Sequence, residues 1–221
     1  MNTFSKAMMA FGLTATMAMP MVSTAYAAPA SEQQATQQLV GLLSGLNSLT
    51  ANFEQKTTST GKQSAKQKQS LTAQHMSQSF SGVMKVARPG KFYWETTRPA
   101  KQVIVSTGSS VLIYDPDLRQ AVRQKLDSQV SNTPALLLSG NTAKIMQTYR
   151  VTQPDAGKMS YVLYPKNKDG VFQSLSIGFA ANKTPLHMIL KDNMGQLTHI
   201  RFSNAKLNAS IPASTFNFTP P

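Results

Sequence analysis

Cysteine is absent from this 221-residue chain, and acidic residues are scarce. Without cysteine, the chain has no disulfides, no thiolate metal sites, no cysteine nucleophile and no lipid attached to a cysteine. Only 14% of the residues are charged, and 22 Lys and Arg stand against 9 Asp and Glu, for a net charge of +13. Because the surplus is positive, acidic partners and anionic surfaces are favoured over cationic ones.

Recognisable catalytic motifs are also missing. The chain contains no G-x-S-x-G, H-E-x-x-H, P-loop or G-x-G-x-x-G pattern. Of the three histidines, His75, His187 and His199, strand pairing could bring the last two together, but two histidines without a third ligand do not predict a metal site. The lysines are scattered, with no platform of aromatic and basic residues for nucleic acid. The sequence therefore predicts no enzyme, no cofactor or metal, and no nucleic-acid partner.

The first 27 residues have the pattern of a secretory signal peptide. Lys6 precedes an apolar run from Ala7 to Val22, and Ala25-Tyr26-Ala27 follows as a small-x-small cleavage site. The run is shorter than the roughly 20 residues that a transmembrane helix needs. We expect cleavage after Ala27, export from the cytoplasm, and a single mature domain over residues 28–221 without a transmembrane segment. An uncleaved anchor is the less favoured alternative.

Residues 31 to 53 predict one amphipathic helix. Ser31 and Gln34 form a capping-box pattern, and apolar residues then recur at spacings of three and four. These residues are Leu39, Leu42, Leu43, Leu46, Leu49 and Phe53. Gly41 and Gly45 each cost a helix about 1 kcal/mol relative to alanine. The helix must therefore gain its stability by packing its apolar stripe onto another surface.

Beyond this helix, a polar segment over 57–69 with three lysines predicts a loop or the tip of a hairpin. Strand patterns of period two then follow. They cover 70–87, 91–97, 101–107, 110–114, 119–126, 145–153, 159–165, 171–180, 185–192 and 196–203. The connections are too short for crossover helices, so the predicted sheet is antiparallel. About ten strands is near the size at which an open sheet curls.

Residues 132–140 interrupt the strands. Thr133 as N-cap, Pro134 at the first helical position and Gly140 at the end predict a short helix, and its three consecutive leucines need an apolar surface. The simplest architecture is a curved sheet whose concave apolar face is covered by the two predicted helices. The first interpretation of the apolar stripes is an ordinary hydrophobic core, and the alternative is a cavity that binds an apolar ligand.

Several motifs together resemble the LolA family of outer-membrane lipoprotein carriers. They are Ser81–Glu95 (SGVMKVARPGKFYWE), Pro99, Gln102-Val103-Ile104-Val105-Ser106, Gly108, and Tyr114-Asp115-Pro116 with Gln120. The leucine-rich first helix ending in FEQK, the Thr133-Pro134 helix and the closing FNFTPP extend the resemblance over essentially the whole mature chain. The order and spacing of these pieces, rather than any one of them, carry the resemblance.

The resemblance implies a periplasmic monomer, mainly β with α, built as an unclosed antiparallel β-barrel covered by a helical lid over a hydrophobic cavity. It also implies that the cavity takes acyl chains of lipoproteins released by an inner-membrane LolCDE-type ABC transporter, and that the cargo passes to a LolB-type outer-membrane receptor. LolB is itself a lipoprotein and needs a cysteine, so a chain without cysteine fits the soluble carrier better. A lipid-binding or lipid-sensing module of the same fold is the alternative function.

Within this resemblance, Arg88 corresponds to the arginine that ties the lid to the barrel. From the apolar stripes we expect the cavity to be lined by Leu39, Leu42, Leu46, Phe92, Trp94, Val103, Val105, Leu136, Leu137 and Phe179. Two departures from the family pattern stand out. The stretch from Phe53 to Gly82 is longer than usual, and the chain stops at Pro220-Pro221.

Overall fold

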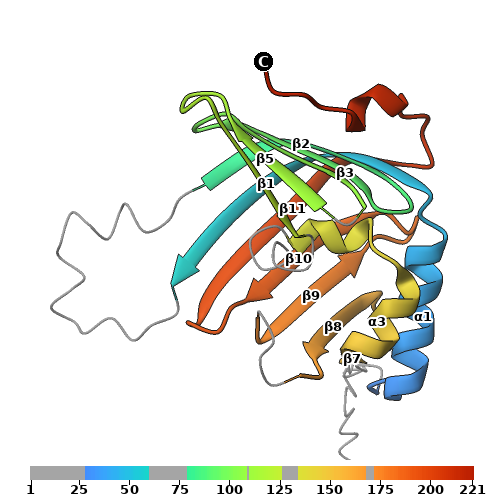
Figure 1. Cartoon of the computed structure of the whole chain (residues 1–221). Helices are drawn as coiled ribbons and strands as arrows, with labels where there is room; N and C mark the ends of the chain where they lie inside the picture. Colours follow the sequence, from blue (N-terminus) through green and yellow to red (C-terminus); the bar gives the residue numbers. More distant parts are fainter. Residues whose placement is uncertain (1–27, 60–78, 109, 126–133, 168–171) are drawn as a thin grey trace, which may run out of the picture.

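The computed structural model describes residues 28–59, 79–108, 110–125, 134–167 and 172–221. The predicted signal peptide and most of the predicted 57–69 loop lie outside these residues. The elements, labelled as in Figure 1, are α1 (Glu32–Ser44), β1 (Ser48–Ser59), β2 (Ser79–Ala87), β3 (Lys91–Arg98), β4 (Gln102–Thr107), β5 (Ser110–Asp115), β6 (Gln120–Lys125), the 3-10 helix η3 (Pro134–Leu138), α3 (Thr142–Thr148), β7 (Tyr149–Thr152), β8 (Ser160–Pro165), β9 (Ser174–Phe179), β10 (Pro185–Lys191), β11 (Gln196–Leu207) and the 3-10 helix η4 (Ala213–Phe216).

The described strands form one antiparallel sheet in the order β6-β5-β4-β3-β2-β1-β11-β10-β9-β8-β7. The pairing of β1 with β11 joins the two meanders at the centre, and β6 and β7 remain as the two edges. Figure 1 shows the sheet curving around α1, η3 and α3, which together we call the lid. The predicted fold class, an unclosed antiparallel barrel covered by helices, is confirmed.

The first helix is shorter than predicted. Its capping box at Ser31 and Gln34 forms as expected, but α1 ends at Ser44 with Gly45 as its C-cap. Leu49 and Phe53, which the spacing places in the helix, lie on β1, where they alternate with half-buried and exposed residues. A spacing of four residues keeps two side chains on one face of a strand as well as of a helix. The sequence pattern could therefore not distinguish the two structures over this stretch.

The predicted strand over 145–153 is wrong in its first half. Residues Thr142–Thr148 form α3, whose N-cap Asn141 accepts a hydrogen bond from the amide of Ala143. Only Tyr149–Thr152 form a strand, β7. Likewise β2 begins at Ser79 rather than at residue 70, with residues 70–78 outside the description. The short predicted helix is present as the 3-10 turn η3.

The main core lies between the lid and the concave face of the sheet. From α1 it buries Leu39 and Leu43, and every residue of η3 is buried. A second, smaller cluster lies on the outer face, where Val103, Val105 and Tyr114 are covered by Phe218 of the C-terminal segment. The sheet is therefore apolar over most of its concave face and only locally on its outer face.

Candidate functional site

The floor of the site is an aromatic cluster on the concave face. Phe53 on β1 stacks on Trp94 of β3, with ring centroids 3.5 Å apart and an interplanar angle of 21°. Phe92 lies two residues before Trp94 on the same face, 6.1 Å away between centroids. Alternation along a strand places residues i and i+2 on one face, and the pairing of β2 with its neighbours brings the separate strands into this register. The result is a wide apolar surface without charged groups among these rings.

The lid covers this floor with leucine side chains. Leu136, Leu137 and Leu138 of η3 are all buried, as are Leu39 and Leu43 of α1. The lid is also tied by a polar contact, because the hydroxyl of Tyr161 on β8 donates to Oε1 of Gln38 at 3.2 Å. Burial raises the pKa of this Tyr161 hydroxyl, so it remains a protonated donor. The leucines thus occupy the concave face in this structure.

Arg88 joins two parts of the lid to the sheet. It stands at the end of β2, and its guanidinium donates to the carbonyl of Leu43 at the end of α1 and to the carbonyl of Gly140 after η3. The last carbonyls of a helix have no partner within the helix, so a cation there is favourable. Burial lowers the pKa of Arg88, although an arginine side chain stays charged in proteins. One side chain therefore bridges α1 and the η3–α3 connection.

A hollow of about 580 Å³ lies beside α1. Its apolar wall includes Leu42 of α1 and Leu46 just after the helix, together with Met159 and Tyr161, and Lys183 also lines it. Leu42 is half-buried, whereas Leu46 is buried. Two of the expected lining residues, Leu42 and Leu46, therefore adjoin open space as well as the core.

Eight of the ten predicted lining residues belong to or pack against the main core. They are Leu39, Leu42, Leu46, Phe92, Trp94, Leu136, Leu137 and Phe179. Val103 and Val105 instead belong to the outer cluster, because the residue between them, Ile104, is the one that faces the core. Since all three positions on this strand are apolar, alternation alone gave no sign of which face was inward.

Sequence reasoning also missed several concave-face residues. Met84 is fully buried beside Trp94, and Phe53, which had been assigned to a helix, stacks on the same tryptophan. The sequence does contain a signal for Met84, because it lies two residues from Val86 and therefore on the same face of β2. Recognising it required the strand register, which depends on pairing between distant segments.

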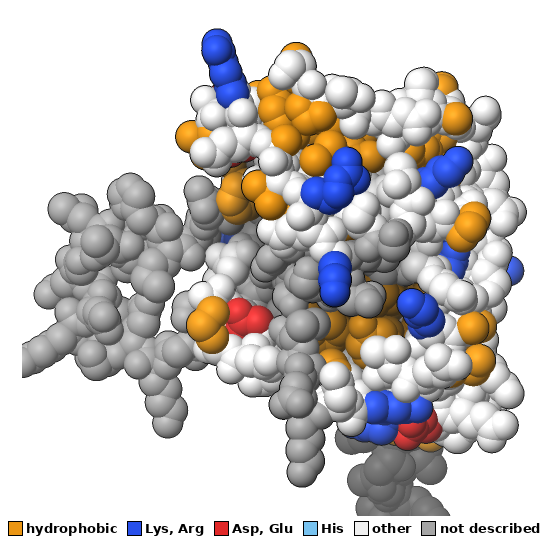
Figure 2. Space-filling view, viewed as in Figure 1, with side chains coloured by type: hydrophobic (Ala, Val, Ile, Leu, Met, Phe, Trp, Pro, Cys, Tyr) orange, Lys and Arg blue, Asp and Glu red, His pale blue; other side chains and the backbone are white. Residues whose placement is uncertain are grey.

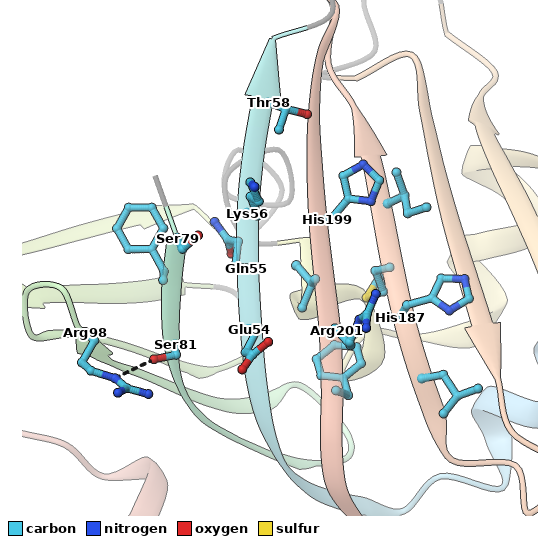
Figure 3. A pocket seen from close by; sticks show the side chains of 16 residues that line it. Glu54, Gln55, Lys56, Thr58, Ser79, Ser81, Arg98, His187, His199 and Arg201 are labelled. Atoms are coloured by element: carbon cyan, nitrogen blue, oxygen red, sulfur yellow. Dashed lines mark hydrogen bonds between the residues drawn. The ribbon is translucent and has the colours of Figure 1, made fainter. Parts of the chain in front are cut away.

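The outer face carries a different kind of depression. Figure 3 shows a groove into which Glu54, Lys56, Arg201 and His199 project from β1 and β11. Its volume is about 1140 Å³. His187 lies on the adjacent strand β10, opposite Arg201. In the part of the chain that the structure describes, no three His, Cys, Asp or Glu side chains form a group that could hold a metal ion. Charged and polar side chains thus stand in this groove beside apolar ones such as Leu186 and Ile189, whereas the aromatic floor under the lid has no charged group among its rings.

Taken together, an unclosed antiparallel sheet with an apolar concave face beneath a helical lid defines an open half-barrel. The model of the family "Outer membrane lipoprotein carrier protein LolA" matches residues 44–219. The chain therefore belongs to the LolA family. Within the described ranges, no helix is long and apolar enough to cross a membrane.

Relatives named as lipoprotein carriers match almost all of the chain. An outer-membrane lipoprotein carrier protein of Pseudomonas putida is 40% identical over 90% of this chain and 89% of its own length. Its counterpart in Pseudomonas fluorescens is 39% identical over 93% and 94%. Among solved structures, a LolA superfamily protein from Nitrosomonas europaea matches with a TM-score of 0.47 at 11% identity, over 82% of this chain and 97% of its own. The family assignment rests on the sequence comparisons.

Proposed function

We propose that this protein is a periplasmic carrier that binds the acyl chains of lipoproteins and delivers them to the outer membrane. The observation that carries the proposal is the combination of family membership with a lid-covered apolar face. Relatives about 40% identical over nine-tenths of the chain bear the name outer-membrane lipoprotein carrier protein. The work is binding and release, with no bond made or broken.

The energies of lid closure and cargo binding are of similar size. Burying a leucine contributes about 1.5–3 kcal/mol, so the three leucines of η3 contribute about 5–9 kcal/mol to closure. Exposing a 16-carbon acyl chain to water costs a free energy of about 0.8 kcal/mol for each CH₂, or on the order of 10 kcal/mol in total. Because the two terms are comparable, cargo and lid can exchange for the same surface without either becoming irreversible.

In this proposal, Arg88 is the latch of the closed state. Its two carbonyl partners are Leu43 of α1 and Gly140, two residues after η3, so both contacts must break if the lid moves away from the sheet. Because the bonds go to backbone carbonyls, they set the position of the lid without depending on its side chains. The eight core residues named above then serve as the acyl-chain surface, with Phe92, Trp94 and Phe179 contributed by the sheet and the other five by the helices and the residues next to them.

The partners follow from the family resemblance. We infer that cargo arrives from an inner-membrane LolCDE-type transporter and leaves to a LolB-type receptor of the outer membrane. Figure 2 shows that Lys and Arg outnumber acidic groups on the lid-bearing face. Loss of the signal peptide removes only Lys6, so the charge changes from +13 to +12. This surplus supports an approach to anionic membrane surfaces.

The test is mass spectrometry of the protein purified from the periplasm under native conditions. A carrier is expected to bring acylated proteins with it. As a control, residues 28–221 produced in the cytoplasm, away from mature lipoproteins, should carry none. Phospholipid alone would indicate the lipid-binding or sensing module instead, and an empty protein from the periplasm would contradict both functions.

A further inference from the structure

A row of apolar side chains crosses the concave face from the core to one edge of the sheet. Strand pairing sets Trp94 of β3 beside Ile104 of β4, Ile104 beside Ile113 of β5, and Ile113 beside Val122 of β6. Paired residues share a face, and neighbouring strands lie about 4.8 Å apart. The four side chains therefore form a continuous apolar track that runs across the strands.

Exposure increases along this track. Trp94 and Ile104 are buried, with 3% and 6% of their surface exposed, and both belong to the main core. Ile113 is half-buried against that core, and Val122 is 47% exposed. A large exposed apolar residue at the end of a buried row is a point where apolar surface meets water. The track thus connects the interior to solvent at β6.

The neighbouring row in the same half of the sheet is not apolar. It leads from Phe92 to Ser106, then to Val111 and Gln124. The hydroxyl of Ser106 donates to the carbonyl of Ser110, so a polar contact interrupts this row inside the sheet. The Trp94 row is therefore the better path for a hydrocarbon chain.

The two edges of the sheet differ in their cover. Both α1 and α3 pack against β7, and Val151 of β7 is fully buried. In contrast, all six residues of β6 are exposed. Figure 2 shows exposed hydrophobic side chains over the hairpins of the β2–β5 half of the molecule. Among the residues that the structure describes, the β6 edge is thus the more exposed of the two edges of the sheet.

We propose that the β6 edge is where the acyl chain enters and leaves, sliding over Val122 and Ile113 toward Trp94. The inference rests on the proposed carrier function and names the route for its cargo. Each CH₂ that moves from water onto the track contributes about 0.8 kcal/mol, so the row supplies partial burial before the lid leucines are displaced. Val122 is then a residue that cargo contacts in passing, whereas Trp94 contacts cargo when bound.

This distinction gives a kinetic test. A carboxylate in Val122→Glu would have to be passed by the chain in both directions, which raises the barrier without altering the bound state. We expect the association and dissociation rate constants for a fluorescent 16-carbon fatty acid to fall together by about tenfold, with an unchanged Kd. Stopped-flow mixing of the mature protein with the probe measures both rates.

Ala121→Glu is the matched control. Ala121 is the next residue on the same strand, is also exposed, and faces the outer side opposite Tyr114. Ala121→Glu adds the same charge to the same strand but on the face away from the track, so it should leave both rates unchanged. Val122→Leu should also leave the rates near those of the unaltered protein. Because positions 121 and 122 are exposed, the thermal midpoints of all three variants should match that of the unaltered protein.

Each outcome decides the matter. If Val122→Glu slows both association and dissociation while Ala121→Glu and Val122→Leu slow neither, the β6 route is supported. Equal rates in Val122→Glu and Ala121→Glu, or a change confined to Kd, would overturn the route while leaving the carrier function intact. If the unaltered protein does not take up the fatty acid at all, the carrier function itself fails, and the route with it.

Discussion

The side chain of Arg88 contacts two separate segments of the chain, because its guanidinium joins the end of α1 to the connection after η3. The chain contains a second Arg-Pro pair, Arg98-Pro99, whose arginine has a much simpler environment. The Nε of Arg98 donates to the hydroxyl of Ser81 at 3.1 Å, and its side chain is exposed. The two arginines therefore provide an internal comparison between a lid contact and a surface contact.

Replacing Arg88 by leucine should weaken lid closure. Hydrogen bonds from a charged group contribute about 1.5–3 kcal/mol each when buried, and since Arg88 is half-buried we expect a loss of about 1–2 kcal/mol from the closed state. Cargo competes with the lid, so Arg88→Leu should hold a fluorescent fatty acid about 5- to 30-fold more tightly and release it more slowly to acceptor vesicles. Arg98→Leu should behave like the unaltered protein, and equal release from both variants would contradict the latch.

His187 gives a prediction on acid stability. Its pKa is lowered from 6.5 by burial first, and then by the nearby charges of Arg201 and His199. The unfolded chain therefore binds a proton at a higher pH than the folded protein does, and the free energy of unfolding should fall as the pH drops below about 6.5. In His187→Gln, the free energy of unfolding should depend less on pH in this range, as measured by urea unfolding at several pH values. An equally steep fall in His187→Gln would assign the effect to other groups.

At the scale of elements, two glycines have opposite constraints. A side chain on Gly82 of β2 would place its Cβ 1.8 Å from the carbonyl oxygen of Glu95 on β3, so the strands can pair this closely only with glycine. A side chain on Gly41 of α1 would meet nothing within 4 Å. The first glycine is required by the sheet, whereas the second only lowers the stability of the helix.

Alanine substitutions should separate the two cases. Gly82→Ala pushes β2 away from β3 next to the Phe53 ring and should lower the free energy of unfolding by about 1–3 kcal/mol. Gly41→Ala should raise it by about 0.5–1 kcal/mol, because alanine favours the helix. Chemical unfolding of both variants measures the difference. A Gly82→Ala protein as stable as the unaltered one would show that the strands adjust at little cost.

At the scale of the whole molecule, carrier function requires that loading moves the lid while the sheet stays intact. Two amides in one turn report on these parts separately. The amide of Gly90 donates to the carbonyl of Ser139, directly after η3 of the lid, at 2.9 Å. The amide of Arg88 donates to the carbonyl of Asn47, just before β1, at the same distance. Only the first of these bonds spans the contact that cargo displaces.

Hydrogen exchange followed by NMR should therefore show a divided response to a bound fatty acid. The Gly90 amide should lose protection, while the Arg88 amide keeps it. Global stability should nevertheless rise, by about 2.7 kcal/mol when the free ligand is at 100 times its Kd. If both amides keep their protection in the loaded protein, cargo binds without moving η3, and the proposal that cargo displaces the lid is wrong.

Much of the fold was accessible from the sequence. Period-two stripes and short connections predicted an antiparallel sheet, and the apolar leucines near residues 39–46 and 136–138 predicted its cover. These features are local, since each depends on which side chains a short segment places on one face. The errors were local too, because Leu49 with Phe53 and Ile145 with Tyr149 are four residues apart, a spacing that fits a strand and a helix equally.

What the sequence could not decide was which segments meet. The separation of Val103 and Val105 from Ile104, the stacking of Phe53 on Trp94, and the row that ends at Val122 all depend on strand register across the sheet. A shift of one residue in that register would turn every side chain to the other face. The amino-acid pattern alone thus determined that an apolar face and its cover exist, and the tertiary pairing decided which side chains lie on it and where it opens to water.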